Sequence, residues 1–278
     1  MISMGAVWDR TAEFLSDHQG SILPIALLAI FVPAVISGNF SELQHGATPN
    51  LAATLGLGSL ALALLSFWGQ LAIVALALDP AHGRAAAALA ARRFPAALLV
   101  MGVLLLAAFA LLSPALVILG TSGANFSTIT TDTMPQVPPA AATWIAVYFL
   151  VLLPVFLWLA ARLIVVLPVV VGEPLAIRAI ARSWRLTRGL ALKIAGVIIL
   201  YFVVSIVANL AATTAFGAVI YLIAGRGQDG MSLATVLTTI VGGAVSTAFT
   251  VLGMVFATKL FVALLIRGDE REEAARVQ

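Results

Sequence analysis

Basic side chains are the most numerous groups in this sequence with a capacity for chemistry. The chain contains 15 lysines and arginines, 12 aspartates and glutamates, three histidines and no cysteine. The lack of cysteine excludes disulfides and thiolate chemistry. His18, His45 and His82 are too far apart to match a metal-ligand spacing. We therefore expect neither a metal nor a cofactor.

Arginines cluster in short segments between apolar runs. Arg178, Arg182 and Arg185 recur at helical spacing, which places them on one face of a helix. Basic clusters beside a membrane attract anionic lipid by ~1 kcal/mol per residue. The same clusters would arise from topology alone, because cytoplasmic loops are enriched in Lys and Arg. Both explanations stay open for the candidate headgroup contacts, which are Arg84, Arg92, Arg93, Arg178, Arg182, Arg185 and Arg188.

Catalytic groups do not occur at the usual spacings. The sequence has no His-Glu-x-x-His, no Gly-x-Ser-x-Gly and no phosphate-binding Walker loop. Acidic residues are confined to loops and to the ends of apolar runs, so no carboxylate pair falls inside a run. Serines and threonines in the last two runs have no neighbouring base and suit hydrogen bonding between helices. The sequence predicts a protein that is not an enzyme.

The elements that carry these residues must lie in a membrane. Of 278 residues, 62% are hydrophobic and 10% are charged, whereas soluble domains are ~25% charged. With a mean hydropathy of +1.11, the chain has too little polar surface to cover a soluble globule. The pI of about 9.8 rests on few charges, so nucleic acid is not an expected partner.

Six apolar runs have roughly the length of a membrane-spanning helix, which needs ~20 residues. They cover residues 21–37, 51–78, 95–119, 141–171, 190–224 and 231–266. Asp9, Glu13 and Asp17 precede the first run, where a signal peptide would be basic, so we expect this helix to be retained. The fold predicted for residues 1–278 is a single, all-α, six-helix transmembrane domain.

Charges in the connecting segments predict the orientation. Twelve lysines and arginines fall on the side of the N-terminus, and one, Arg226, falls in the opposite loops at 38–50, 120–140 and 225–230. Because cytoplasmic loops carry the excess of positive charge, both termini are expected in the cytoplasm. The predicted location is the inner membrane of a bacterium.

Arg162 and Lys259 fall inside predicted spans. In an unbroken helix, Arg162 would lie ~15 Å from the end of its span at Gly172, near mid-membrane. Charges at that depth are costly and often functional, but long basic side chains also reach the interface. We expect Lys259 to do so. Partners available to Arg162 are backbone carbonyls, Gln70, Asn209, water and lipid phosphate.

Three amphipathic segments, 4–17, 79–94 and 173–188, are predicted to form interfacial helices. In the first, Val7 and Phe14 lie on one arc, and the charged residues lie opposite. Each segment precedes an apolar hairpin, an order compatible with a threefold repeat of elbow helix plus hairpin. A multi-pass protein with short inside loops would share this layout, so the repeat stays one of two explanations.

Residues 173–189 carry a pattern with a known counterpart. Glu173-Pro174 is followed by Ser183-Trp184-Arg185-Leu186-Thr187-Arg188-Gly189 and an apolar run. This pattern resembles the membrane domain attached to some bacterial glycerophosphodiester phosphodiesterases and present in related stand-alone inner-membrane proteins. The stretch Ala90-Ala91-Arg92-Arg93-Phe94-Pro95 is similar to that family's earlier elbow. The resemblance implies a helical membrane fold without the phosphodiesterase activity, which belongs to a separate soluble barrel domain.

These features favour a non-enzymatic inner-membrane protein that contacts anionic lipid and supports membrane homeostasis or transport. Membrane lipids, with anionic headgroups foremost, are the expected partners. One alternative is a transporter of a small solute or lipid, with a polar cavity near Arg162. Another is a membrane scaffold or partner subunit.

Overall fold

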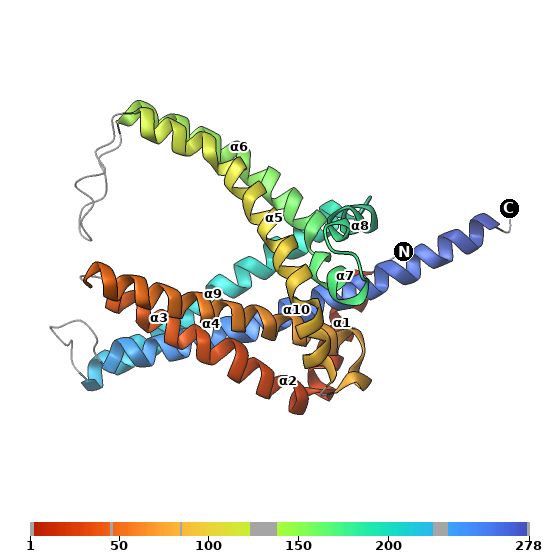
Figure 1. The fold of residues 1–278 in the computed structure, drawn as a ribbon, viewed down its shortest axis with the longest axis horizontal. Helices are drawn as coiled ribbons and strands as arrows, with labels where there is room; N and C mark the ends of the chain where they lie inside the picture. The colour runs from red at the N-terminus through yellow and green to blue at the C-terminus, as the bar shows by residue number, and fades with distance from the viewer. Residues whose placement is uncertain (1–2, 45–46, 84, 123–137, 225–232, 277–278) are drawn as a thin grey trace.

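Every regular element is a helix in the part of the chain that the structure, a computed structural model, describes: residues 3–44, 47–83, 85–122, 138–224 and 233–276 (Figure 1). Six helical stretches are long and apolar enough to cross a membrane, and they are Gln19–Phe40, Pro49–Leu78, Ala85–Thr121, Pro139–Gly172, Ala191–Ile220 and Val236–Gly268. The predicted all-α bundle with six spans is confirmed. The threefold repeat stays a prediction.

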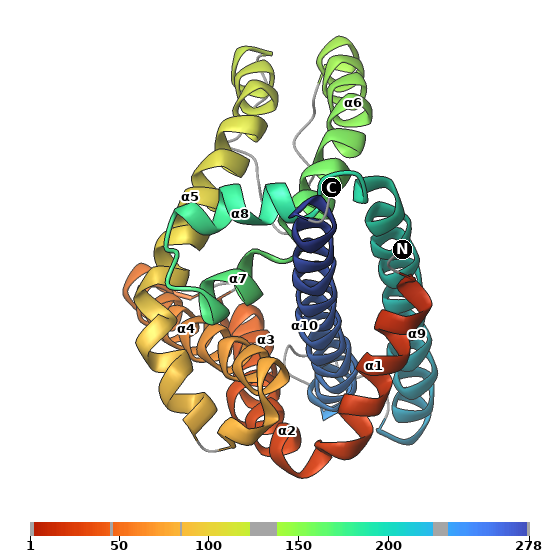
Figure 2. The ribbon, with the colours of Figure 1, turned by 90° about the vertical axis from the view of Figure 1, so that its right-hand side faces the viewer.

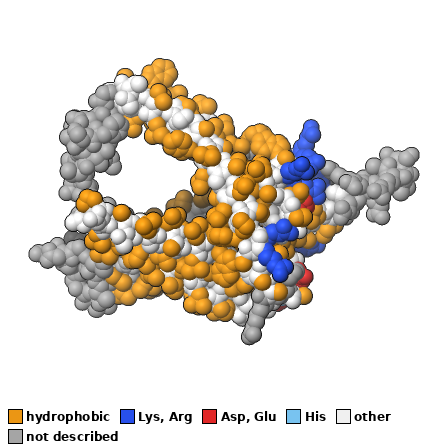
Figure 3. Space-filling model, viewed as in Figure 1, with side chains coloured by type: hydrophobic (Ala, Val, Ile, Leu, Met, Phe, Trp, Pro, Cys, Tyr) orange, Lys and Arg blue, Asp and Glu red, His pale blue; other side chains and the backbone are white. Residues whose placement is uncertain are grey.

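The outer surface is apolar along the length of the bundle (Figure 3). Leu150, Leu106 and Leu28 are 75%, 71% and 70% exposed. A soluble protein rarely leaves so continuous an apolar surface in water. The protein is therefore a multi-pass membrane protein, and lipid covers these side chains.

The first span is divided by a change in helix type. It consists of α2 (Gln19–Ile25), the π-helical η1 (Ala26–Phe31) and α3 (Val32–Gln44). The amide of Val32 donates to the carbonyl of Leu27, five residues earlier. Pro33 has no amide hydrogen, and its ring would crowd the carbonyl four residues before it in a regular α-helix. A wider turn relieves that clash.

Close packing joins this span to α4 (Pro49–Leu78). A Cβ placed on Gly69 would lie 2.5 Å from the Cβ of Ala29, so only glycine allows the two helices to approach this far. From Gly69 onward α4 is almost wholly buried, with Leu71 to Ala77 no more than 1% exposed. The end of α4 therefore forms part of the central core.

The predicted interfacial helix 79–94 is not a separate element. A short 3₁₀ turn, η2 (Pro80–His82), comes first, and the Asp79 side chain accepts from the amide of Ala81 at 2.9 Å. Next, α5 runs without interruption over Ala85–Thr121, including Pro95 and Pro114. Figure 1 shows α5 changing direction along its length, as helices do at proline. The prediction treated Pro95 as a boundary, whereas α5 continues through it.

The fourth span is broken near its end. Helix α6 covers Pro139–Leu163, a turn follows at residues 164–165, and the short α7 covers Val166–Gly172. Val165, Val166, Val169, Val170 and Val171 are each at most 2% exposed. Helix α7 packs against α4, α5, α8 and α10 and is part of the buried core.

The predicted elbow helix 173–188 is shorter than expected. Helix α8 covers only Arg178–Leu186, because residues 173–177 form an irregular connection after α7. Pro174 disfavours helical geometry at Glu173, so α7 ends at Gly172. Gly189 ends the segment with a φ of +82°, a conformation that glycine adopts at little cost.

The last two helices complete the bundle. Helix α9 covers Ala191–Ala224, and α10 covers Leu233–Arg276, which extends beyond the predicted end of its span at residue 266. Helix α10 lies at the centre, contacting α9, α4, η1, α3, α7 and α8 (Figure 2). The amphipathic α1 (Met4–Asp17) also packs along α10, with Val7, Thr11 and Phe14 buried. Its apolar face thus meets protein, whereas the sequence suggested lipid.

Candidate functional site at the basic end

Lysine and arginine side chains gather at one end of the bundle, which we call the basic end (Figure 3). Six of these side chains are exposed, those of Arg10, Arg92, Arg178, Arg185, Arg188 and Lys193. Five are half-buried, those of Arg93, Arg162, Arg182, Lys259 and Arg267. Arg84 and Arg226 lie outside the described residues, as do most of the loops predicted at 120–140 and 225–230.

Helix α8 is attached to the bundle by a face of small side chains. Ala179, Ser183 and Thr187 recur every four residues, and all three are fully buried. The Ser183 hydroxyl donates to the carbonyl of Arg162 at 2.7 Å. The Thr187 hydroxyl lies 3.3 Å from the same carbonyl and 2.9 Å from that of Ser183. The last carbonyls of a helix lack partners within it, so α8 caps the end of α6.

The Arg162 guanidinium lies beside a pair of packed indole rings. Its guanidinium carbon is 5.5 Å from the ring centroids of both Trp158 and Trp184. The two rings are perpendicular, with centroids 4.9 Å apart. Nη1 donates to the carbonyl of Trp184 at 3.4 Å, and the buried Nε has no partner among the described residues. Aromatic faces stabilise a desolvated cation by roughly 0.5–2 kcal/mol.

This position differs from the mid-membrane depth estimated for Arg162. The estimate assumed an unbroken helix to Gly172, but α6 ends at Leu163. Arg162 is therefore at the level of α8, with its charge near the basic end. Its aromatic neighbours, Trp158 and Trp184, were not identified from the sequence. The spacing of four between Trp158 and Arg162 is the signal that would have found the first.

An ion pair holds the irregular connection before α8. Nε of Arg182 lies 3.3 Å from Oε1 of Glu173. The two side chains are 33% and 25% exposed, so the pair adds at most ~1 kcal/mol to stability. Its main consequence is for recognition, because the positive charge of Arg182 is already paired. Arg178, Arg185 and Arg188 have no acidic partner within the described part of the chain.

Lys259 also lies at the basic end. Its Nζ donates to the carbonyl of Ala77 at 2.9 Å and sits 4.3 Å from the ring centroid of Phe14. Ala77 is in the last turn of α4, where the helix dipole favours a cation. Lys259 thus joins α10, α4 and α1, so its charge is used inside the protein.

Gln70 and Asn209 do not share contacts with Arg162. The Asn209 amide donates to the Ser246 hydroxyl at 3.0 Å and lies 3.5 Å from the Gly242 carbonyl, so it links α9 to α10. Gln70 is half-buried on α4. A cavity of about 570 Å³ lies between α1, α2, η1 and α10, and one of about 450 Å³ lies beside Arg93 and Glu173. Neither is lined by Arg162, Gln70 or Asn209.

Comparison with known proteins finds one similarity, in the part of the chain that contains α8. Residues 140–275 match the family described as the membrane domain of glycerophosphoryl diester phosphodiesterase. These residues are similar to a membrane domain of that type. The resemblance seen in the sequence is therefore confirmed, and the match is to the membrane part of such an enzyme, not to its catalytic part. No curated protein and no solved structure matches the chain.

The motif that carried the resemblance has a structural explanation in this membrane domain. Ser183 and Thr187 cap α6, and Trp184 packs on Arg162. Glu173 pairs with Arg182, and Gly189 takes the left-handed conformation before α9. We call residues 173–189 the elbow from here on. These residues support α8, whereas Arg178, Arg185 and Arg188 of the same segment are exposed.

Proposed function

We propose that the protein binds anionic phospholipid headgroups through the exposed arginines of the elbow, and that it catalyses no reaction itself. The observation that carries the proposal is that one face of α8 attaches the helix to the bundle and the other presents arginines. Its small polar face fixes the helix to α6, while Arg178, Arg185 and Arg188 are exposed and have no described acidic partner. A supported helix that presents unpaired guanidinium groups is suited to binding phosphate.

The orientation supports the same proposal. The excess of Lys and Arg at the basic end supports a cytoplasmic position for that end by the positive-inside rule, and the inner leaflet on that side carries anionic lipid. At ~1 kcal/mol per residue, three arginines supply about 3 kcal/mol of attraction, or roughly a hundredfold preference over neutral lipid. Such binding suits a role in membrane homeostasis or in transport at the inner membrane of a bacterium.

A lipid transporter is the second candidate. The larger of the two cavities has an apolar lining and adjoins a π-helical segment, and π-helical turns recur at functional sites. A transporter for polar solutes would instead need several converging polar groups in its cavity. The neighbours of Arg162 favour lipid over such a solute, because its guanidinium is held by two indoles and one carbonyl.

The proposal is tested by removing the unpaired charges from α8. In the triple variant Arg178→Gln, Arg185→Gln, Arg188→Gln, native mass spectrometry from mild detergent should show most of the retained anionic lipid lost. The melting temperature should stay unchanged, because none of the three side chains supports the fold. The matched control removes three charges at the same end but away from α8: Arg10→Gln, Lys193→Gln, Arg267→Gln. Equal lipid loss in both variants would reduce the elbow to a topology signal.

A further inference from the structure

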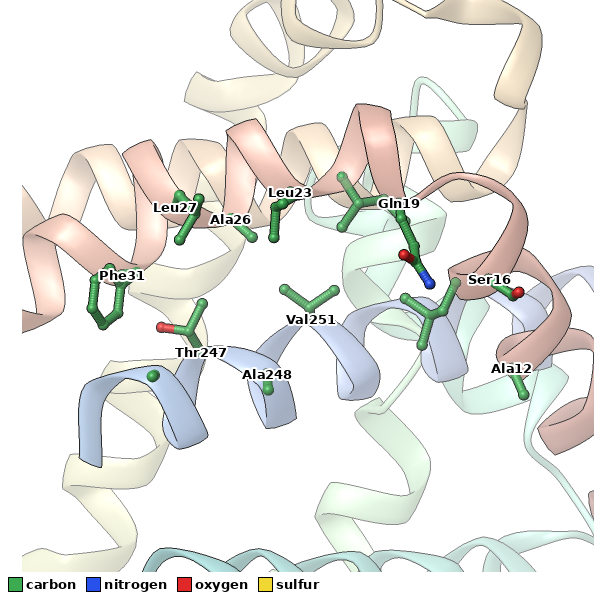
Figure 4. A pocket seen from close by; sticks show the side chains of 13 residues that line it. Ala12, Ser16, Gln19, Leu23, Ala26, Leu27, Phe31, Thr247, Ala248 and Val251 are labelled. Atoms are coloured by element: carbon green, nitrogen blue, oxygen red, sulfur yellow. The ribbon is translucent and has the colours of Figure 1, made fainter. Parts of the chain in front are cut away.

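The larger cavity is a groove between the first span and α10. Leu23, Leu27 and Phe31 line one side, and Ala248 and Val251 face them from α10 (Figure 4). Ser16 and Gln19 lie at the end of the groove near α1 (Figure 4). The volume is about 570 Å³, within the usual range of small-molecule sites. The groove is independent of the elbow, since no residue of α8 lines it.

Two packing features keep this groove from closing. Ala29 is held against Gly69, which ties η1 to α4 on the side away from the groove. On the other wall, α10 presents small side chains at Ala244, Thr247 and Ala248. Small side chains leave the two helices unable to interdigitate at this level, so the space between them persists.

The length of the groove corresponds to one leaflet. From Gln19 to Phe31 the helix advances by at most ~18 Å, since the α-helical rise is 1.5 Å per residue and the π-helical turn of η1 is wider, and half of the hydrocarbon core is ~15 Å. The Gln19 end is near the basic end, because Phe14 in the preceding helix contacts Lys259. The groove thus runs from the interface at the basic end to about mid-membrane.

We propose that this groove binds one acyl chain of a phospholipid from the leaflet at the basic end. Its position within the spans makes lipid the surrounding solvent. Ser16 and Gln19 provide polar groups at headgroup level, and the wall beyond them is apolar as far as Thr247. The groove holds this single acyl chain at a defined position, whereas the surrounding lipids only cover the exposed helices.

Thr247 distinguishes a hydrocarbon occupant from a polar one. Its side chain is 7% exposed, and its hydroxyl has no partner among the described residues. Thr250 and Thr258 on the same helix donate to carbonyls four residues earlier, at 2.8 and 2.7 Å. The protein alone already removes the Thr247 hydroxyl from solvent, so a hydrocarbon chain beside it loses no further hydrogen bond. Thr247→Val should therefore leave chain binding unchanged or strengthen it.

The experiment uses phosphatidylglycerol with a photoactivatable diazirine midway along one acyl chain, in nanodiscs that contain the full-length protein. Crosslinks should concentrate on peptides 12–31 and 244–251. In Ala244→Phe, Ala248→Phe, two phenylalanines fill the groove from exposed positions, and crosslinking there should fall at least fivefold. The matched control, Ala107→Phe, Ala110→Phe, changes two exposed alanines of α5 and should keep the wild-type level.

Several results would overturn the proposal. Crosslinks spread evenly over all exposed helices would show surrounding lipid only, and equal losses in both double variants would show the same. Crosslinking of one copy of the protein to another through these peptides would assign the groove to an oligomer. Loss of crosslinking in Thr247→Val would mean that the occupant presents a polar group at this depth.

A second variant serves if the filled double variant fails to fold. Leu23→Trp changes a lining residue that is 57% exposed, and the same loss of crosslinking is expected. Since elbow arginines do not line the groove, failure here leaves the headgroup proposal standing, and the reverse also holds.

Discussion

The elbow and the groove both border the basic end, but they are built by opposite kinds of contact. The elbow is held by hydroxyl–carbonyl bonds, an ion pair and a cation that contacts two indoles. The groove is bounded by apolar side chains that do not meet. Directional bonds need particular residues at fixed spacings and therefore leave a motif in the sequence. A packing gap needs only small residues on one side, which leaves no motif.

The largest effect is expected from the bonds that cap α6. The double variant Ser183→Ala, Thr187→Val removes both hydroxyls from the Arg162 carbonyl. An unsatisfied buried carbonyl costs about 2–3 kcal/mol, so the free energy of unfolding in a mild-detergent denaturation series should fall by that amount. Thr143→Val is the control, because its hydroxyl bonds an exposed carbonyl of its own helix. A fall of equal size in the control would contradict a special role for the cap.

A smaller effect is expected where the first span meets α4. Gly69→Ala places a methyl group 2.5 Å from the Cβ of Ala29, and overpacking of this kind costs about 1–3 kcal/mol. The same variant should narrow the groove, because η1 is pushed towards α10. Gly56→Ala is the control, since a Cβ there meets nothing within 4 Å and should stabilise α4 by up to about 1 kcal/mol. Equal unfolding midpoints for the two variants would show that the close approach is not required.

The smallest of the three effects concerns Lys259. Lys259→Met keeps the aliphatic stem but loses the bond to the Ala77 carbonyl and the contact with the Phe14 ring. The expected loss is about 1 kcal/mol of unfolding free energy, since a charged hydrogen bond is replaced by apolar packing. Lys193→Met changes an exposed lysine at the same end and should stay within about 0.5 kcal/mol of the wild type. A larger loss of unfolding free energy in Lys193→Met than in Lys259→Met would contradict a structural role for Lys259.

Hydropathy predicted the architecture because the bilayer imposes it. A spanning segment must satisfy its backbone hydrogen bonds internally, so each long apolar run had to be a helix. Breaks inside a run obey no such rule. At the turn at residues 164–165, the ring of Pro168 would crowd the Ile164 carbonyl four residues earlier in a regular helix. Beyond the turn, α7 packs in a buried position against α4, α5 and α10. That packing set the level of Arg162, which helix length alone misplaced.

The elbow was predictable in part. Its motif indicated the family and its arginines marked the charged surface, but the start of α8 and the pairing of Arg182 with Glu173 depend on tertiary contacts. The groove was not predictable. From the sequence, Thr247 would be expected to bond a carbonyl of its own helix, like the other threonines of α10. Only the structure shows that its hydroxyl has no partner among the described residues and that Thr247 lines the groove.

Both lipid proposals place their ligand in the cytoplasmic leaflet, so the side on which the basic end lies is the central claim. Because the chain has no cysteine, single cysteines report it directly. Ala181→Cys lies exposed on α8, and Thr48→Cys, Thr121→Cys and Ala140→Cys lie exposed at the opposite ends of three spans. An impermeant thiol reagent should label these last three on intact cells and Ala181→Cys only after the cells are opened. Labelling of Ala181→Cys on intact cells, with the other three protected, would contradict the claim.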